Sequence, residues 1–330
     1  MRNVFTFLLL LFSLLCNGQS PKLFTTDKEL SSSLINQIYQ DRNGFIWVAT
    51  EDGLNRYDGA KFTIYKHEPD NEHSLAHNFV RTVFEDSKGH LLIGTYIGIQ
   101  MYDRATDNFT PLAKWEDTGE TLESNINSFI ERKNGEIWVS GNVLYKLDIK
   151  DHLLTVRKAD IAVTSPGSLF EDKKQNVWMA KGEEGVYQLT PDNQLTLHLS
   201  KDNGYVKSIC EDQRGNIYAG SIRKGLFIYD KERKTFVPVN LKEKGELPVC
   251  FLYSGIPNEL YIGTDGKGVV IYNIQTHEIS EYKFDNNYFD SGNSKIHSIL
   301  KDNSGNLWLA VYQKGVILIP ARTNSFKYIG

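Results

Sequence analysis

The sequence predicts an all-β fold, a seven-bladed β-propeller built from four-stranded antiparallel blades. A phrase of short apolar strands separated by polar turns recurs seven times along the 330 residues. The large residue at its centre returns every 40 to 47 residues, a spacing typical of propeller blades. No long stretch has the i, i+3, i+4 apolar spacing of a helix, whereas aromatic residues reach 12% and 26 glycines supply turns. The central residues, one in each repeat, are Trp47, Leu92, Trp138, Trp178, Tyr218, Tyr261 and Trp308.

The composition describes a chain that builds a packed core. Hydrophobic residues make up 40% and charged residues 24%, with only 9 prolines, which excludes disordered, collagen-like and low-complexity classes. The 37 basic and 41 acidic residues give a formal net charge of -4. No basic run is long enough to follow a phosphate backbone, so we expect no nucleic-acid partner.

Residues 1–18 have the features of a secretory signal peptide. Arg2 gives a positive start, residues 4–15 are almost entirely apolar, and Cys16 to Gly18 offer small residues for cleavage. As a helix the apolar stretch would span about 18 Å, short of the roughly 30 Å of a bilayer core, which disfavours the alternative of a retained anchor. Cys16 raises a lipoprotein as a further alternative, but the bulky Leu15 before it argues against one. We expect cleavage, a periplasmic location, no membrane span in the mature chain, and a propeller over residues 19–330.

Each repeat predicts four strands, A to D. In the first repeat they cover residues 35–40, 45–50, 54–57 and 62–65, and the later outermost strands are expected at 109–112, 154–156, 195–197, 236–239, 279–282 and 326–329. Residues 22–26 form an additional segment of the outer type before the first repeat. We expect Phe24 to pair with residues 316–319, because this closure removes two exposed sheet edges at the cost of joining distant parts of the chain.

This closure predicts that residues 326–329 lead into a following element, so that the chain is the N-terminal part of a longer array. The alternative is a stand-alone propeller in which residues 326–329 complete the last blade.

An aspartate begins the turn between strands A and B in five repeats. A carboxylate there can accept backbone N–H groups, and a following glycine can adopt positive φ. Paired carboxylates could instead indicate acid/base catalysis, but repetition around a ring favours an architectural role. Blade 3 has Arg132 at this place and blade 6 has residues 255–258, so these two turns should be the least regular. The aspartates are Asp41, Asp86, Asp172, Asp212 and Asp302.

Two cysteines, Cys210 and Cys250, remain after removal of the signal peptide. An oxidising compartment would permit a disulfide. Cys210, however, stands three positions later in its repeat than Cys250 does in its own. Because side chains alternate along a strand, this odd difference places the two on opposite strand faces. We expect two unpaired thiols.

The first repeat resembles the two-component regulator propeller repeat, whose pattern is approximately D-x-x-G-x-[LI]-W-[LIV]-G-T-x-x-G-[LI]-x-x-[FY]. Residues 43–58 follow it with Ala49 in place of the usual glycine, and Thr95 and Thr264 keep the Gly-Thr pair. Blade 3 departs from it by a shortened turn at residues 141–142. The resemblance covers about residues 35–330 and implies the periplasmic sensor region of a Bacteroidetes hybrid two-component regulator, with an oligosaccharide ligand. It also implies that further repeats, an immunoglobulin-like domain, a membrane helix and kinase modules follow.

One face of the disc is expected to carry a ligand site. Because strand direction alternates, the D to A connections and the B to C turns share a face, and its longest loops are residues 66–74, 113–124 and 284–294. Trp115, Tyr288 and Phe289 lie in these loops. Exposed aromatic rings beside polar groups suit a sugar, and they suit a protein interface equally. The B to C turns contribute Tyr96, Arg223, Asp265 and Tyr312.

Strand A provides a second set of candidates. An apolar column (Ile35, Val80, Ile126, Pro166, Val206, Val249 and Ile296) adjoins a mostly polar one (Asn36, Arg81, Asn127, Gly167, Lys207, Cys250 and His297). Innermost strands surround the axis of a propeller, so we expect the polar column to line the channel mouth. The alternative is that it merely holds channel water. The candidate ligand-binding residues are therefore Asn36, Arg81, Tyr96, Trp115, Asn127, Lys207, Arg223, Asp265, His297 and Tyr312.

Motifs of known catalytic or metal chemistry are missing from the sequence. There is no His-Glu-x-x-His, no Gly-x-Ser-x-Gly and no complete phosphate-binding loop, and the glycine-rich residues 263–268 read as a hairpin. Residues 285–287 with Asp290 lack the spacing of a calcium loop, and His67 and His73 read as solvated loop residues. We expect no metal, no cofactor and no kinase activity in this chain.

Three functions remain open. A sensor module is the expectation. A secreted propeller enzyme, a polysaccharide lyase or glycosidase, would require Arg81, His297 and Tyr312 to converge at one mouth of the channel. A non-catalytic scaffold is the third.

Overall fold

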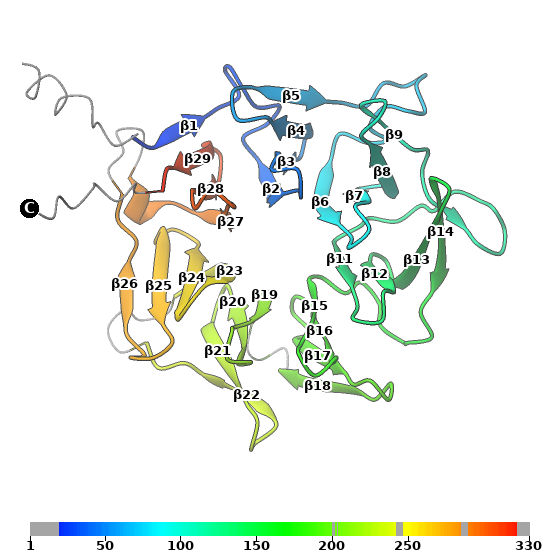
Figure 1. The fold of residues 1–330 in the computed structure, drawn as a ribbon. Coiled ribbons are helices and arrows are strands. Elements are labelled where there is room, and N and C mark those ends of the chain that lie inside the picture. Colours follow the sequence, from blue (N-terminus) through cyan, green and yellow to red (C-terminus); the bar gives the residue numbers. More distant parts are fainter. Residues whose placement is uncertain (1–19, 200–201, 203, 242–246, 285–289, 322–330) are drawn as a thin grey trace, which may run out of the picture.

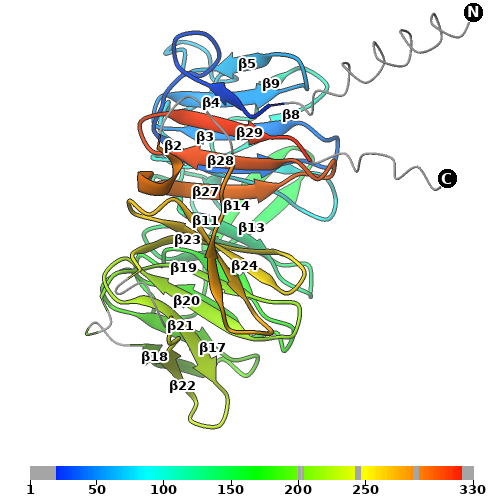
Figure 2. The same cartoon turned by 90° about the vertical axis from the view of Figure 1, so that its left-hand side faces the viewer.

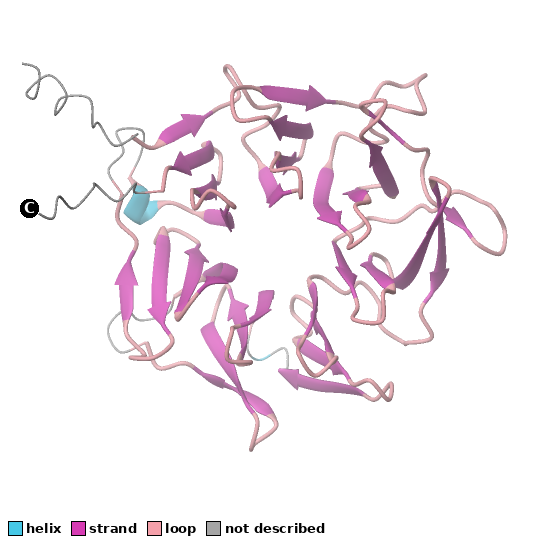
Figure 3. Cartoon of the chain, in the orientation of Figure 1, coloured by secondary structure: helices cyan, strands magenta, loops and turns pink. Residues whose placement is uncertain are grey.

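Seven separate β-sheets stand in a ring around a central axis in the computed structural model (Figure 1). The structure describes residues 20–199, 202, 204–241, 247–284 and 290–321. Seen from the side, the sheets form a flat disc (Figure 2). Helical structure in these ranges is limited to 3-10 turns such as η2 (Ser291–Asn293) (Figure 3). The predicted all-β, seven-bladed propeller is confirmed.

Within a blade, the strands pair in sequence order from the axis to the rim. Blade 1 contains β2 (Ile35–Gln40), β3 (Ile46–Thr50), β4 (Gly53–Tyr57) and β5 (Phe62–Tyr65). Blade 2 contains β6 (Val80–Glu85), β7 (Leu91–Thr95), β8 (Ile99–Asp103) and β9 (Asn108–Phe109). Blade 3 contains β11 (Ser128–Glu131), β12 (Ile137–Ser140), β13 (Leu144–Lys150) and β14 (Leu153–Lys158). Blade 4 contains β15 (Leu169–Glu171), β16 (Val177–Ala180), β17 (Val186–Leu189) and β18 (Leu195–Leu199).

The remaining blades repeat this order. Blade 5 contains β19 (Val206–Glu211), β20 (Ile217–Ser221), β21 (Gly225–Asp230) and β22 (Thr235–Pro238). Blade 6 contains β23 (Val249–Ile256), β24 (Glu259–Thr264), β25 (Val269–Asn273) and β26 (Ile279–Glu281). Blade 7 contains β27 (Ile296–Lys301), β28 (Leu307–Val311) and β29 (Gly315–Ile319), and its fourth strand is β1 (Lys22–Phe24).

Blade 3 differs from the predicted four-stranded antiparallel pattern. A fifth strand, β10 (Lys114–Trp115), lies at its outer edge and runs parallel to β14, with Trp115 opposite Val156. The long connection between blades 2 and 3 supplies this strand. It covers an edge that would otherwise be left unpaired.

The N-terminal strand closes the ring as predicted. β1 pairs antiparallel with β29, and Phe24 is the partner of Val316. The ring of Phe24 is fully buried and stacks on Trp308 with 5.9 Å between centroids. Residues 326–329 lie outside the described residues, so their predicted role as a lead-in stays a prediction.

The large residue at the centre of each repeat packs into the junction with the next blade. Trp47 of blade 1, for example, lies in one cluster with Val80 and Ile93 of blade 2, and Trp308 of blade 7 lies with Ile38 of blade 1. Each of the seven junctions contains one such cluster. Each repeat of the sequence therefore contributes one large residue to one interblade core.

The predicted architectural role of the aspartates is confirmed. Asp41 accepts the backbone N–H groups of Asn43 and Phe45, both at 3.0 Å, and the indole N–H of Trp47 at 2.9 Å. Each aspartate thereby ties the A to B turn to the strand that follows it, and it also bonds the central residue where that residue is Trp or Tyr.

The expectation of an irregular turn was wrong for blade 3 and right for blade 6. Arg132 N–H donates to the Glu136 carbonyl at 2.8 Å, the backbone bond found in the other blades, and the Glu136 carboxylate accepts the Trp138 indole at 3.2 Å. A carboxylate four residues later thus replaces the missing aspartate. In blade 6 the strands continue to a tight turn, and the register shifts between Tyr253 and Ile256.

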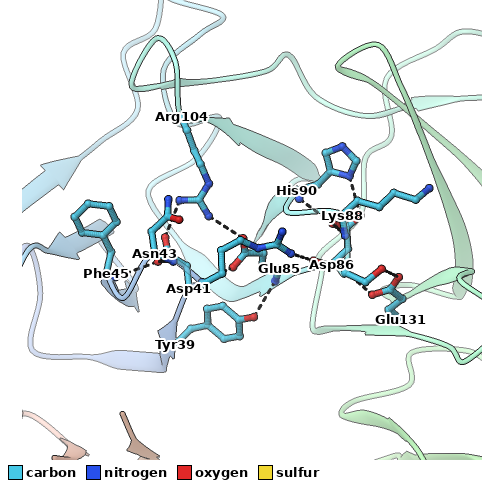
Figure 4. Close-up of polar contacts among 12 residues, drawn as sticks. Tyr39, Asp41, Asn43, Phe45, Glu85, Asp86, Lys88, His90, Arg104 and Glu131 are labelled. Carbon is cyan, nitrogen blue, oxygen red and sulfur yellow. Dashed lines mark hydrogen bonds and ion pairs between the residues drawn. The ribbon is translucent and has the colours of Figure 1, made fainter. Parts of the chain in front are cut away.

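An interblade belt joins the A to B turns on the face opposite the long loops. At five junctions, the last residue of strand A accepts the backbone N–H of the second turn residue in the preceding blade. The pairs, donor first, are Arg42 with Glu85, Ser87 with Glu131, Lys133 with Glu171, Lys173 with Glu211 and Asn303 with Gln40. Between blades 1 and 2, Arg104 also bridges Asp41 at 2.8 Å and Glu85 at 3.0 Å (Figure 4).

Both cysteines are free, as predicted. Cys210 packs against the interblade core beside Tyr218, whereas Cys250 is buried and faces the axis. Among the described residues, no helix has the length and apolar character needed to cross a membrane.

Candidate ligand site at the channel mouth

A cavity of about 720 Å³ opens at the axis, on the face of the long loops. It is named here the mouth cavity. Strand A of each blade contributes to the wall of this cavity. These innermost strands converge on the axis, and their side chains alternate between the core and the axis. All seven residues of the predicted polar column line it: Asn36, Arg81, Asn127, Gly167, Lys207, Cys250 and His297.

The position before the apolar column also faces this cavity. Phe79, Ser165 and Tyr205 line it from there, and Tyr205 is 42% exposed. These residues were not among the predicted site residues, although the two-residue period of a strand places positions on either side of a buried residue on the same face. That alternation is the signal that could have found them.

An aromatic and cationic cluster forms the wall at blades 5 to 7. Tyr312 is 39% exposed, and its ring centroid lies 5.1 Å from that of His297. The Lys295 ammonium lies 5.2 Å from the Tyr312 ring and is paired with Asp265 at 2.8 Å. Lys207 extends from the neighbouring strand β19 into the same cavity.

The protonation of this wall is shifted by its surroundings. Burial, followed by the positive charges of Lys207 and Lys295, lowers the pKa of His297 to about 4. The pKa of Lys207 is lowered, chiefly by burial of its ammonium, although the residue as a whole is exposed at the cavity. Burial raises the pKa of the Cys250 thiol. Near neutral pH the imidazole is therefore uncharged and the cysteine is a thiol.

Several polar atoms at this cavity have no protein partner. Five buried side-chain nitrogen or oxygen atoms among the described residues lack a hydrogen bond, and three of them belong to mouth-cavity residues: Arg81 Nε, Ser168 Oγ and His297 Nε2. Buried polar groups in native proteins are nearly always hydrogen-bonded, so such a concentration needs an explanation. Water or a polar ligand would satisfy them.

Two members of the polar column have structural partners. The Asn36 amide donates to the Val80 carbonyl at 2.7 Å, and the Asn127 amide donates to the Pro166 carbonyl at 3.2 Å. Both bonds connect adjacent blades. These side chains therefore line the cavity while holding its wall together.

Four of the ten predicted residues lie away from the lining of the mouth cavity. Tyr96 borders a separate depression with Ile97 and Asn142, and Trp115 lies at the rim of blade 3 beside Arg157. Arg223 is exposed, with Glu183 3.6 Å away. Asp265 is held behind the wall by Lys295. The other six, Asn36, Arg81, Asn127, Lys207, His297 and Tyr312, share the cavity.

No group of three or more metal-ligating residues is assembled among the described residues. His67 Nδ1 lies 2.9 Å from the Leu75 carbonyl, and His73 Nδ1 lies 3.1 Å from the Phe109 carbonyl, so backbone groups engage both rings. Asp290 caps η2. The other residues of the weighed calcium segment, 285–287, lie outside the described residues.

Comparison with known proteins identifies the repeat. Residues 29–52 and 74–96 match the family model described as two component regulator propeller. One matched segment lies in blade 1 and the other in blade 2. The two matched segments run from the loop before strand A to the turn after strand B. They include the mouth-cavity residues Asn36 and Arg81.

Two of the proteins that match are longer than this chain. Histidine kinase P4 of Formosa agariphila is 40% identical over 83 residues, which are 23% of this chain and 6% of that protein. The extracellular domain of the putative hybrid two component system BT3049 from B. thetaiotaomicron has a TM-score of 0.77 at 22% identity, over 92% of this chain and 42% of that chain. This chain therefore spans less than half the length of either.

A propeller enzyme is also similar in fold. A catalytically inactive virginiamycin B lyase from Staphylococcus aureus, solved with quinupristin, has a TM-score of 0.68 at 12% identity, over 91% of this chain and 98% of that chain. At these identities the structural likenesses show the fold alone.

Proposed function

We propose that the chain is the ligand-recognition propeller of a two-component sensor and that it binds an oligosaccharide in the mouth cavity. The observation that carries this proposal is the convergence of solvent-facing tyrosines and unpartnered polar groups in one cavity, on a chain with sensor-type repeats.

The chemistry of the cavity suits a sugar. A pyranose presents apolar C–H faces and hydroxyl edges, and aromatic rings beside hydrogen-bonding groups complement both. Tyr205 and Tyr312 supply exposed rings, while Arg81, Lys207 and His297 line the same cavity with polar side chains. The volume of about 720 Å³ is within the range of small-ligand sites and would hold a short oligosaccharide.

Isothermal titration calorimetry of the purified chain against an oligosaccharide panel tests this proposal. Tyr205→Ala and Tyr312→Ala should each weaken binding about tenfold, since each removes a stacking ring. Tyr96→Ala is the matched control, because Tyr96 is exposed on the same face but outside the mouth cavity. Absence of binding by every oligosaccharide, or equal effects of all three substitutions, would contradict the proposal.

A second candidate, a lyase or glycosidase, is favoured by the convergence of Arg81, His297 and Tyr312 on this cavity. A neutral imidazole can act as a base, a phenol can donate a proton, and a guanidinium can stabilise developing negative charge. Product chromatography after incubation with the same panel separates the candidates. Cleavage products that form with the wild-type protein but not with His297→Gln would establish the enzyme. Oligosaccharides that all remain uncleaved would favour the sensor.

We also propose that residues 1–18 direct export, and that later domains of the same receptor receive the signal. The extracellular relatives of similar fold support this context. The intact mass of protein recovered from the periplasm tests the first point, since cleavage would remove the mass of residues 1–18.

A further inference from the structure

We propose that the mouth cavity contains an anion subsite, centred on Lys207, that selects oligosaccharides bearing a carboxylate or a sulfate ester. This inference rests on the proposed function and narrows its ligand class. It follows from how the charged residues around the cavity are paired.

Most ionic groups around the cavity already have partners. Lys181 is paired with Glu184 at 2.6 Å, and Lys295 is paired with Asp265 at 2.8 Å. Lys207, by contrast, has no ion pair and no hydrogen bond to any described residue, although its side chain projects into the cavity. Lys207 is exposed at the cavity, so its ammonium, which has no counterion, is open to an anionic ligand group.

The immediate surroundings of Lys207 reinforce this positive field. The carboxylate of Asp265 is engaged by Lys295, so it offsets that lysine and leaves the charge of Lys207 in excess. After burial, repulsion from Lys295 lowers the pKa of Lys207, and both lysines lower the pKa of His297, whose ring is neutral near pH 7. An oxyanion bound here would relieve that repulsion.

A second unpaired cation borders the same cavity from blade 2. The Arg81 guanidinium lies 5.2 Å from the Phe79 ring, makes no ion pair with a described residue, and has a buried Nε without a partner. The remaining charged residue of the lining is Glu51, which lies exposed at the rim. The cavity therefore presents two unpaired cations against one exposed carboxylate.

The experiment compares three oligosaccharides of equal length by calorimetry: an oligogalacturonate, a sulfated galactan fragment and a neutral galactan fragment. The first two separate carboxylate from sulfate as the source of the anion. At least one acidic ligand should bind at least about tenfold more tightly than the neutral one, and its affinity should fall as salt is raised.

Lys207→Gln should weaken acidic binding about 10- to 100-fold and should weaken neutral binding far less. Lys224→Gln is the matched control, because Lys224 is exposed on the same face outside the cavity and should leave every affinity unchanged. The thermal midpoint of Lys207→Gln should not fall, since the substitution removes an unpaired charge and no structural bond. A fall would indicate a structural role and overturn the inference.

The remaining outcomes separate this inference from the proposed function. Binding of the neutral fragment as tightly as the acidic ones, with no effect of Lys207→Gln, overturns the anion subsite and leaves the oligosaccharide site standing. Failure of all three to bind, together with failure of the wider panel, overturns both.

Discussion

The side chain of Asp172 shows how a single carboxylate holds a blade together. It accepts four donors: the backbone N–H groups of Lys174 and Asn176, the Asn176 amide, and the Trp178 indole. It is 5% exposed, so water cannot replace these bonds. The stability of the turn and the placement of the tryptophan therefore depend on the same group.

Asp172→Ala should lower the free energy of unfolding by about 2 to 4 kcal/mol, because buried donors lose a charged acceptor. Urea denaturation followed by tryptophan fluorescence measures this loss. Asp192→Ala, at an exposed turn position of the same blade, should change stability by less than about 0.5 kcal/mol. Equal losses in the two variants would refute the architectural role of Asp172.

His297 should make the stability of the propeller depend on pH. Its pKa is lowered from 6.5 to about 4 by burial and by Lys207 and Lys295, with Asp265 acting in the opposite direction. Above 6.5 the ring is neutral in both the folded and unfolded states. As pH falls towards 4, the unfolded chain takes up a proton that the folded chain refuses, so folding is destabilised.

His297→Gln removes this titration. Relative to wild type, the variant should therefore gain stability as pH is lowered from about 7.5 to about 4.5. Urea midpoints at several pH values provide the measurement. A difference between the two proteins that is constant with pH would show that His297 does not titrate in this way.

Among the elements, strand A connects neighbouring blades through the interblade belt. The Glu171 carboxylate at the end of β15 accepts the Lys133 backbone N–H at 2.7 Å and pairs with Arg132 at 2.9 Å. Both side chains of this ion pair are largely buried. No belt bond is found among the described residues at the two junctions of blade 6. Its tight turn lacks the donor for the junction with blade 7, and at the junction with blade 5 the Ser254 hydroxyl instead donates to the Glu211 carbonyl at 2.8 Å.

Glu171→Ala should cost about 3 kcal/mol in unfolding free energy, because Arg132 would be left buried without its counterion. Chemical denaturation measures the loss, and Glu232→Ala, at an exposed acidic position, is the control. Equal stability of Glu171→Ala and the control would show that the belt adds nothing to the interblade cores.

At the scale of the whole molecule, closure of the ring depends on a contact between the two ends of the described chain. Phe24 contacts Tyr57 and Phe62 of blade 1 as well as Trp308 of blade 7. One residue of β1 therefore joins three strands from opposite ends of the sequence.

Phe24→Ala should destabilise the propeller by about 3 to 5 kcal/mol, the range for removing a buried aromatic side chain. Ile64→Ala, at a position 46% exposed on the outermost strand of blade 1, should have a much smaller effect. Urea unfolding measures both, and light scattering should detect association of Phe24→Ala through the loosened edge of β29. An unchanged midpoint in Phe24→Ala would mean that the ring does not need β1.

The sequence by itself determined the class, the number of blades and the closing strand, because a repeat specifies each blade from local information. Turn chemistry at Asp41, alternation within strand A and the large central residues each act over a few positions. The same local logic failed at Arg132, where Glu136 supplies the carboxylate through a different backbone position. It also missed β10, since a two-residue strand at a blade edge leaves no periodic signal.

Only the tertiary structure decided which candidates meet. Lys207, His297 and Tyr312 share a cavity because ring closure brings blades 5 and 7 to one axis, whereas Tyr96 and Arg223 occupy equivalent turns but lie outside its lining. Whether a cation is already paired, as Lys295 is with Asp265, or unpaired, as Lys207 is, depends on distances between blades. Such distances are set by packing between residues far apart in the chain, and no local pattern encodes them.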